Sequence, residues 1–161
     1  MSHIKNKTIF NLILLFSIFA LLSAYLIQYV LGHKPCNLCL IERIPYFLTI
    51  IIITLSFIFK KYEKIYLISL ALIFTAASLI SFYHFGIEQG FIKESLVCDL
   101  NKQINILTAE DLLEELKKET ISCKEVTFRI LGLSLATINT IISILLSFIL
   151  INKILNYEKN K

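Results

Sequence analysis

The chain has 161 residues, of which 57% are hydrophobic and only 17% are charged, which excludes an ordinary soluble domain and favours an integral membrane protein. This length suffices for one domain. The formal net charge of +4 does not indicate nucleic-acid binding, because the lysines gather at the ends of the apolar runs.

Four apolar segments are long enough, or nearly long enough, to cross a bilayer as helices of about 20 residues. In chain order they are expected at about residues 9–31, 40–59, 65–86 and 130–151. The first follows Lys5 and Lys7 as a secretion signal would, but its apolar run is too long and no small-residue cleavage site follows it. We therefore predict an all-α integral membrane protein that forms a four-helix transmembrane bundle.

Basic residues in the short connections predict the orientation of the bundle. They lie before the first span, between the second and third spans, and after the fourth span. In that order they are Lys5 and Lys7, then Lys60, Lys61 and Lys64, then Lys153, Lys159 and Lys161. With four spans these segments share one side, so both termini are expected in the cytoplasm. Segments 32–43 and 87–127 then lie on the outer side, and the second holds nine acidic residues against five lysines.

All four cysteines, Cys36, Cys39, Cys98 and Cys123, fall in those two outer segments. An even number of cysteines on the oxidising side of a membrane indicates disulfide chemistry. No metal is predicted, because a four-thiolate zinc site usually needs two CxxC units and only one is present. Two inert structural disulfides remain an alternative, although a loop as short as CxxC stabilises a fold little.

The residues around the CxxC favour a reactive pair. Pro35 ends the preceding helix, and Pro45 either kinks the second span or marks its start. Arg43 follows Cys39 by four residues, so the two side chains share a face if they lie on one helix. A nearby cation and a helix N-terminus both favour the thiolate, which is the reactive form of cysteine.

Three further local patterns concern helix ends and helix packing. Gly86 and Gly90 predict a bend or a close approach of the backbone at the end of the third span. Gly132 and Ala136 have the small-xxx-small spacing of packed membrane helices, and Asn139 is expected to form an interhelical hydrogen bond. In the long outer segment, Thr108–Asp111 fits a capping box and predicts a short helix.

Three stretches are similar, in order, to motifs of the DsbB family of bacterial membrane disulfide-forming proteins. They are Pro35–Pro45, Tyr83–Gly90, and Cys123–Ser134 with Asn139. The likeness covers nearly the whole chain. It departs at Thr127-Phe128, where many members have Pro-Trp, and at Lys124, where an acidic residue is usual.

The resemblance implies a monomeric thiol:quinone oxidoreductase of the bacterial inner membrane, with its four cysteines on the periplasmic side. A Cys98–Cys123 disulfide would accept electrons from a reduced, thioredoxin-fold protein of the DsbA type, and Cys98 would form the mixed disulfide. The electrons would then pass to the Cys36–Cys39 pair through a transient Cys36–Cys123 link.

In that family mechanism the thiolate of Cys39 would reduce a bound quinone, either ubiquinone or menaquinone, while Arg43 stabilises the developing charge. His84 and Glu88, four residues apart on one helical face, would position the quinone or handle its protons; alternatively they anchor the helix end at the interface. One rival is a vitamin K epoxide reductase type enzyme, whose CxxC is expected late in the chain. The other is a non-enzymatic membrane assembly factor with two structural disulfides.

Overall fold

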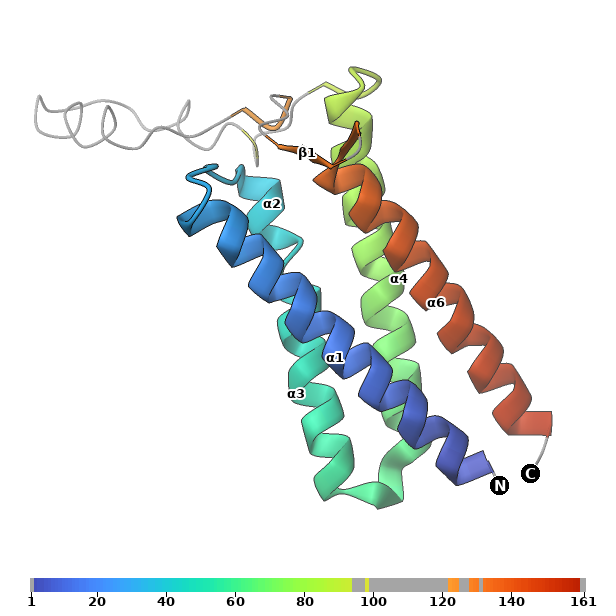
Figure 1. Ribbon diagram of the computed structural model, residues 1–161. Coiled ribbons are helices and arrows are strands. Elements are labelled where there is room, and N and C mark those ends of the chain that lie inside the picture. Colours follow the sequence, from blue (N-terminus) through green and yellow to red (C-terminus); the bar gives the residue numbers. More distant parts are fainter. Residues whose placement is uncertain (1, 94–97, 99–121, 125–127, 131, 160–161) are drawn as a thin grey trace, which may run out of the picture.

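The computed structural model describes residues 2–93, 98, 122–124, 128–130 and 132–159 (Figure 1). Its elements are α1 (Ser2–Tyr29), α2 (Asn37–Ile41), α3 (Ile44–Ile58), the 3-10 turn η1 (Lys60–Tyr62), α4 (Glu63–Glu88), β1 (Arg129–Ile130), β2 (Leu133–Ser134) and α6 (Leu135–Lys159). Within these residues four stretches are long and apolar enough to cross a membrane: Lys7–Tyr29, Asn37–Ile58, Glu63–Glu88 and Leu135–Asn156. The predicted set of four membrane-spanning helices is therefore confirmed.

The four long helices form one bundle in which α1 packs on α3, α3 on α4, and α4 on α6. Figure 1 places the two ends of the chain at the same end of this bundle, and α2 with the β1–β2 hairpin at the opposite end. The assignment of these ends to cytoplasm and periplasm stays a prediction. The predicted capping box at Thr108–Asp111 lies outside the described residues.

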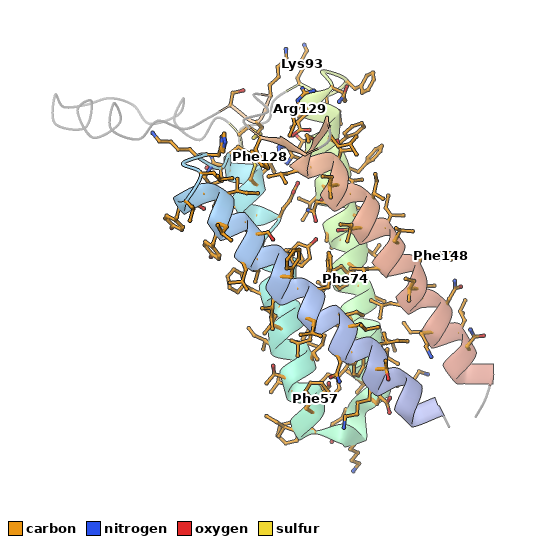
Figure 2. All side chains as sticks on the ribbon, in the orientation of Figure 1. Phe57, Phe74, Lys93, Phe128, Arg129 and Phe148 are labelled. Atoms are coloured by element: carbon orange, nitrogen blue, oxygen red, sulfur yellow. A yellow bond between two sulfur atoms is a disulfide. The ribbon has the colours of Figure 1, made fainter. Side chains whose placement is uncertain are left out.

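The outer surface of the bundle is apolar, as in a membrane protein, while its interior combines an apolar core with buried hydroxyl groups. Large apolar side chains point outward, as Phe19 and Phe148 do with 68% and 63% of their surface exposed, and Figure 2 shows Phe148 on the outer side of α6. Hydroxyl groups such as those of Thr49 and Ser81 are fully buried between the helices. This pattern suits a lipid solvent, in which apolar surface needs no burial and polar groups face their neighbours.

The second crossing is interrupted near its outer end. Helix α2 ends at Ile41, and α3 begins at Ile44 with Pro45 in its first turn. Proline has no amide hydrogen to donate to the preceding turn, so a helix restarts readily where proline occupies its first positions. Cys39 therefore belongs to α2, whereas Arg43 is the N-cap residue of α3, and the two do not share one helix.

The fourth crossing begins at Leu135, and the predicted start at residue 130 is wrong. Before it, β1 and β2 pair antiparallel around Gly132, whose φ of 85° is in the left-handed region that favours glycine. The Ser134 hydroxyl then accepts a hydrogen bond of 3.1 Å from the Thr137 amide and caps α6. Gly132 thus lies outside the helix, and of the predicted small-residue pair only Ala136 is buried there.

Helix α4 extends to Glu88, two residues beyond the predicted end of the third span. Gly90 follows with a φ of 77°, and the amides of Phe91 and Ile92 bond back to the Gly86 carbonyl at 2.9 and 3.1 Å. A Cβ at Gly86 would lie 2.7 Å from Cδ1 of Ile92. Both predictions for these glycines are therefore confirmed: the chain turns at Gly90 and approaches closely at Gly86.

Candidate active site

The four cysteines form two disulfides, Cys36–Cys39 and Cys98–Cys123, whose Cα–Cα distances are 5.1 and 5.7 Å. Three of the four cysteines are buried in one cluster with Ile87 of α4: Cys36, Cys98 and Cys123. Each of the three exposes 5% of its surface or less. The structure thus brings together residues from segments that are far apart in the sequence.

The CxxC opens the short helix α2. Cys36 is its N-cap residue, and its sulfur accepts a hydrogen bond of 3.2 Å from the amide of Cys39. Cys36 is buried, whereas Cys39 is half-buried and lines a cavity between the helices. The two sulfurs of one disulfide therefore face different surroundings.

His84 of α4 lies directly beside this disulfide and exposes only 2% of its surface. Its Nε2 is 3.6 Å from Sγ of Cys36 and 3.8 Å from Oε1 of Glu88, and its Nδ1 is 2.8 Å from Oε1 of Glu42. The backbone of Cys123 is a further hydrogen-bond partner of the same imidazole. The imidazole is therefore held between the Glu42 carboxylate at Nδ1 and the Cys36 sulfur at Nε2.

Glu42 is the centre of a hydrogen-bond network that the sequence did not predict. Its Oε2 accepts from Asn139 Nδ2 at 2.9 Å, and that amide also donates to Ser81 Oγ at 2.7 Å. The Tyr46 hydroxyl donates to Asn139 Oδ1 at 2.5 Å. The expected interhelical hydrogen bond of Asn139 is therefore confirmed, but its partners position the carboxylate that holds His84.

His84 and Glu88 occupy one face of α4, as their spacing predicts. The second oxygen of Glu88 accepts a hydrogen bond from the hydroxyl of Ser134, the residue that caps α6. Glu88 is thereby linked to the start of the fourth crossing. The signal that would have identified these polar partners is their occurrence inside or at the ends of apolar spans, where polar groups are usually functional or paired.

A cavity of about 300 Å³ extends from the CxxC into the bundle. Its polar end is formed by Cys39, Glu42, Arg43, His84 and Glu88. Its apolar wall comes from α1 and α6, with Phe19, Ala24, Ile27, Leu135, Ile138 and Ile142 among the lining residues. A cavity of this size and polarity is typical of a site for an apolar small molecule that carries a few polar atoms.

Arg43 is fixed at the polar end by helix α1. Its Nη1 donates to Oε1 of Gln28 at 2.7 Å, and its guanidinium lies 5.0 Å from the centre of the Tyr25 ring. Phe128, which Figure 2 shows at this end of the bundle, lines the same cavity, and its ring centre lies 5.1 Å from that of His33 in a tilted contact. Arg43 and Cys39 therefore line one cavity, although they do not share the single helix on which their predicted common face depended.

The comparisons with known proteins agree with the predicted resemblance. A family model described as the disulfide bond formation protein DsbB matches residues 6–152 of the chain. The chain is also 31% identical over 157 residues to an uncharacterized protein, RP370, of Rickettsia prowazekii, and the alignment covers 94% of this chain and 90% of that protein. No solved structure matches the chain.

Proposed function

Because the chain belongs to the DsbB family of disulfide bond formation proteins, we propose that it is a thiol:quinone oxidoreductase that reoxidises a periplasmic DsbA-like protein. In the net reaction a partner dithiol and a quinone become a partner disulfide and a quinol, with two electrons and two protons transferred. One observation carries the proposal: the two disulfides pack together, and Cys39 of one of them lines the polar end of an apolar cavity.

The first half of the reaction is thiol–disulfide exchange at the buried cluster. A thiolate of the partner attacks Cys98, which breaks the Cys98–Cys123 bond and frees the Cys123 thiolate. That thiolate attacks Cys36 and releases Cys39. The partner's second thiolate then forms the partner disulfide and frees Cys98, which re-forms its bond to Cys123 and leaves Cys36 and Cys39 reduced. The packing of Cys36 against Cys98 and Cys123 supports this order.

His84 is suited to carry the proton of Cys36 in these steps. The imidazole Nε2 lies 3.6 Å from the sulfur, and Glu42 fixes the ring from the other side at 2.8 Å. A thiol–imidazole–carboxylate arrangement of this kind is a common way to activate a sulfur nucleophile. We therefore assign His84 the role of proton acceptor and donor at Cys36, with Glu42 as its positioning residue.

The cavity fits a quinone by size, polarity and position. Its apolar wall lies on α1 and α6, which are the first and last helices in the order of packing α1–α3–α4–α6. A ligand that arrives from the lipid could enter between these two helices. When bound there, the quinone supplies a two-electron acceptor. Cys39 lines the site, and the fixed guanidinium of Arg43 would stabilise negative charge far better in this dry cavity than in water. Glu88 and His84 are placed to supply protons.

The proposed activity requires the α2 end of the bundle to face the periplasm and both termini to lie in the cytoplasm of a bacterial inner membrane. The lysine-rich segments at the opposite end support this orientation. The partner would then meet Cys98 on the oxidising side. Whether the quinone is ubiquinone or menaquinone is decided by supplying each in turn.

The test is quinone reduction by the full chain in lipid bilayers that contain quinone, with a limiting amount of a reduced thioredoxin-fold protein. We expect Cys36→Ser and Cys39→Ser each to abolish quinol formation. Ser147→Ala, which removes a hydrogen bond between α4 and α6 far along the chain from the cysteines, is the matched control and should retain turnover. Undiminished quinol formation in the cysteine variants would refute the proposal.

A second experiment identifies the partner. In a Cys123→Ser variant Cys98 is a free thiolate that can attack the disulfide of an oxidised DsbA-like protein, and no Cys123 thiolate is present to resolve the mixed disulfide, so the partner is captured covalently. We expect a DsbA-like protein to be recovered with this variant and not with a Cys98→Ser, Cys123→Ser control. Recovery of the same proteins with both variants would argue against Cys98 as the entry point.

A further inference from the structure

We propose that the reduced Cys36–Cys39 pair binds a soft divalent cation, with Zn²⁺ as the best fit, and that His84 is the third ligand. The bound metal would block oxidation of the pair, so the site is inhibitory. This inference goes beyond the proposed function and requires only that this disulfide can be reduced. The sequence predicted no metal because a zinc site of four thiolates usually needs a second CxxC. The structure instead adds an imidazole to the one CxxC.

The positions of the ligand atoms carry the proposal. Sγ of Cys36, Sγ of Cys39 and a ring nitrogen of His84 all lie within 4.8 Å of one another. With Zn–S near 2.3 Å and Zn–N near 2.0 Å, two ligands of a tetrahedral zinc site are roughly 3.5–3.8 Å apart. The Cys36 sulfur and His84 Nε2 already lie 3.6 Å apart. Opening the disulfide therefore needs only a small separation of the two sulfurs to complete three corners of a tetrahedron.

Glu88 lies beside the three clustered ligands without being one of them, so the fourth corner is left to a water molecule, or to Glu88 after a movement toward the sulfurs. Its Oε1 is 3.8 Å from Nε2 of His84, and its other oxygen is held by the Ser134 hydroxyl. A carboxylate oxygen binds zinc at about 2.0–2.2 Å, and a water molecule can take the same position. Two thiolates, one imidazole and one carboxylate or water form a common donor set for this metal.

The residues behind the site are arranged as they are in metal centres. A metal-binding histidine almost always donates its other ring N–H to a carboxylate or carbonyl, which fixes the ring and raises its basicity. Here Nδ1 of His84 contacts Glu42 at 2.8 Å, and Asn139 holds the second oxygen of Glu42 at 2.9 Å. The ring is thereby oriented with Nε2 toward the Cys36 sulfur before any metal arrives.

Binding involves no change of oxidation state. The dithiol and one Zn²⁺ give a zinc dithiolate and two protons, which pass to the buffer. A disulfide cannot supply these thiolates, so the oxidised form has no site. Conversely, a sulfur whose electron pair is bound to zinc is a poor electron donor, and Cys39 would no longer serve an acceptor in the cavity. The metal would hold the protein in its dithiol form until it is removed.

The experiment uses the full chain with Cys98→Ala and Cys123→Ala, so that only one cysteine pair remains, reduced with a phosphine in quinone-free detergent micelles. Co²⁺ is the probe, because thiolate ligation gives a near-ultraviolet charge-transfer band and tetrahedral geometry gives intense visible bands. We expect both signals to saturate at one Co²⁺ per chain and to disappear when Zn²⁺ is added in competition. Prior oxidation of the pair with diamide should abolish them.

Variants of the ligands then separate this site from adventitious binding. His84→Asn should weaken Co²⁺ binding by at least tenfold, and Glu42→Gln by roughly tenfold, the usual effect of losing a residue that orients a metal-binding histidine. The matched control is His33→Asn, which removes an imidazole that contacts the Phe128 ring and is not part of the ligand cluster. Absent thiolate bands in the parent, or unchanged affinity in His84→Asn, would overturn the proposal.

The metal site and the proposed enzyme can fail separately. In the protein with all four cysteines, micromolar Zn²⁺ should inhibit turnover, and a chelator should restore it. Metal-free turnover without any Co²⁺ band would refute the metal site and leave the enzyme standing. A Co²⁺ band in a protein that never reduces quinone would do the opposite. A Cys36→Ala version of the two-cysteine protein must lose the band, because one thiolate and one imidazole no longer form the site.

Discussion

The hydrogen bond between Glu42 and Asn139 should contribute measurably more to stability than an ordinary interhelical hydrogen bond. It joins the α2–α3 connection to α6, over 97 positions in the sequence, at 2.9 Å. Neutral interhelical hydrogen bonds in membrane proteins average about 0.6 kcal/mol, and bonds to a charged group are about twice as strong. We therefore expect a coupling free energy of about 1.2 kcal/mol between Glu42→Ala and Asn139→Ala.

A double-mutant cycle measures this coupling, because it subtracts the cavity and the other contacts that each substitution removes. The free energy of unfolding would be obtained for the parent, both single variants and the double variant, by reversible unfolding in mixed micelles of increasing SDS content. Thr75 and Ser147 provide the matched control, since their hydroxyls join α4 to α6 at 2.7 Å without a charge, and their coupling should be about 0.6 kcal/mol.

Two results would refute this prediction. One is a Glu42–Asn139 coupling no larger than that of the control pair. The other is a coupling below about 0.3 kcal/mol, within which the effects of independent substitutions usually add. Either result would mean that Asn139 does not hold the carboxylate. Glu42 would then be free to leave His84, and neither the proton-carrying role of the imidazole nor its fixed orientation toward a metal could rest on this network.

Three further predictions concern single positions. Arg43→Ala should lower kcat/KM for quinone at least tenfold, about 1.4 kcal/mol, mainly through KM in a quinone titration, and Gln28→Leu should act in the same direction but less. Ser134→Ala should destabilise the protein by about 1 kcal/mol in SDS unfolding because α6 loses its cap, whereas Ser134→Thr should not. Gly86→Ala should stabilise an Ile92→Ala variant by about 1 kcal/mol, because alanine favours the helix more than glycine does. It should not stabilise the parent protein, in which the new Cβ would lie 2.7 Å from Cδ1 of Ile92.

The features predictable from the sequence are those that a single segment determines. A membrane crossing needs about 20 apolar residues, so the four spans follow from composition alone. The shared face of His84 and Glu88 follows from the period of one helix. The turn at Gly90 follows from the freedom of glycine at positive φ. None of these depends on knowing which helices are neighbours.

The features that were missed depend on packing between segments. In the sequence Glu42 is predicted only to be a charge near the membrane surface. Its contacts with His84 and Asn139 arise because α4 and α6 pack beside it in the fold. Two-residue strands such as β1 are too short to show an alternating pattern, so the sequence predicts helix where the hairpin precedes Leu135. Proline at position 45 signalled a break or a kink, and the sequence could not choose between them.

The asymmetry of the CxxC gives the proposed electron transfer its direction. Cys36 is buried in one cluster with Cys98 and Cys123 and lies beside His84, and it is the sulfur that the Cys123 thiolate attacks in the proposed exchange. Breaking the bond there frees Cys39, which lines the apolar cavity with Arg43. With the roles exchanged, the attack would fall on the sulfur at the cavity, and the freed thiolate would face the other disulfide and could only reverse the exchange. In the proposed reaction one turn of α2 therefore separates the entry of electrons from their exit.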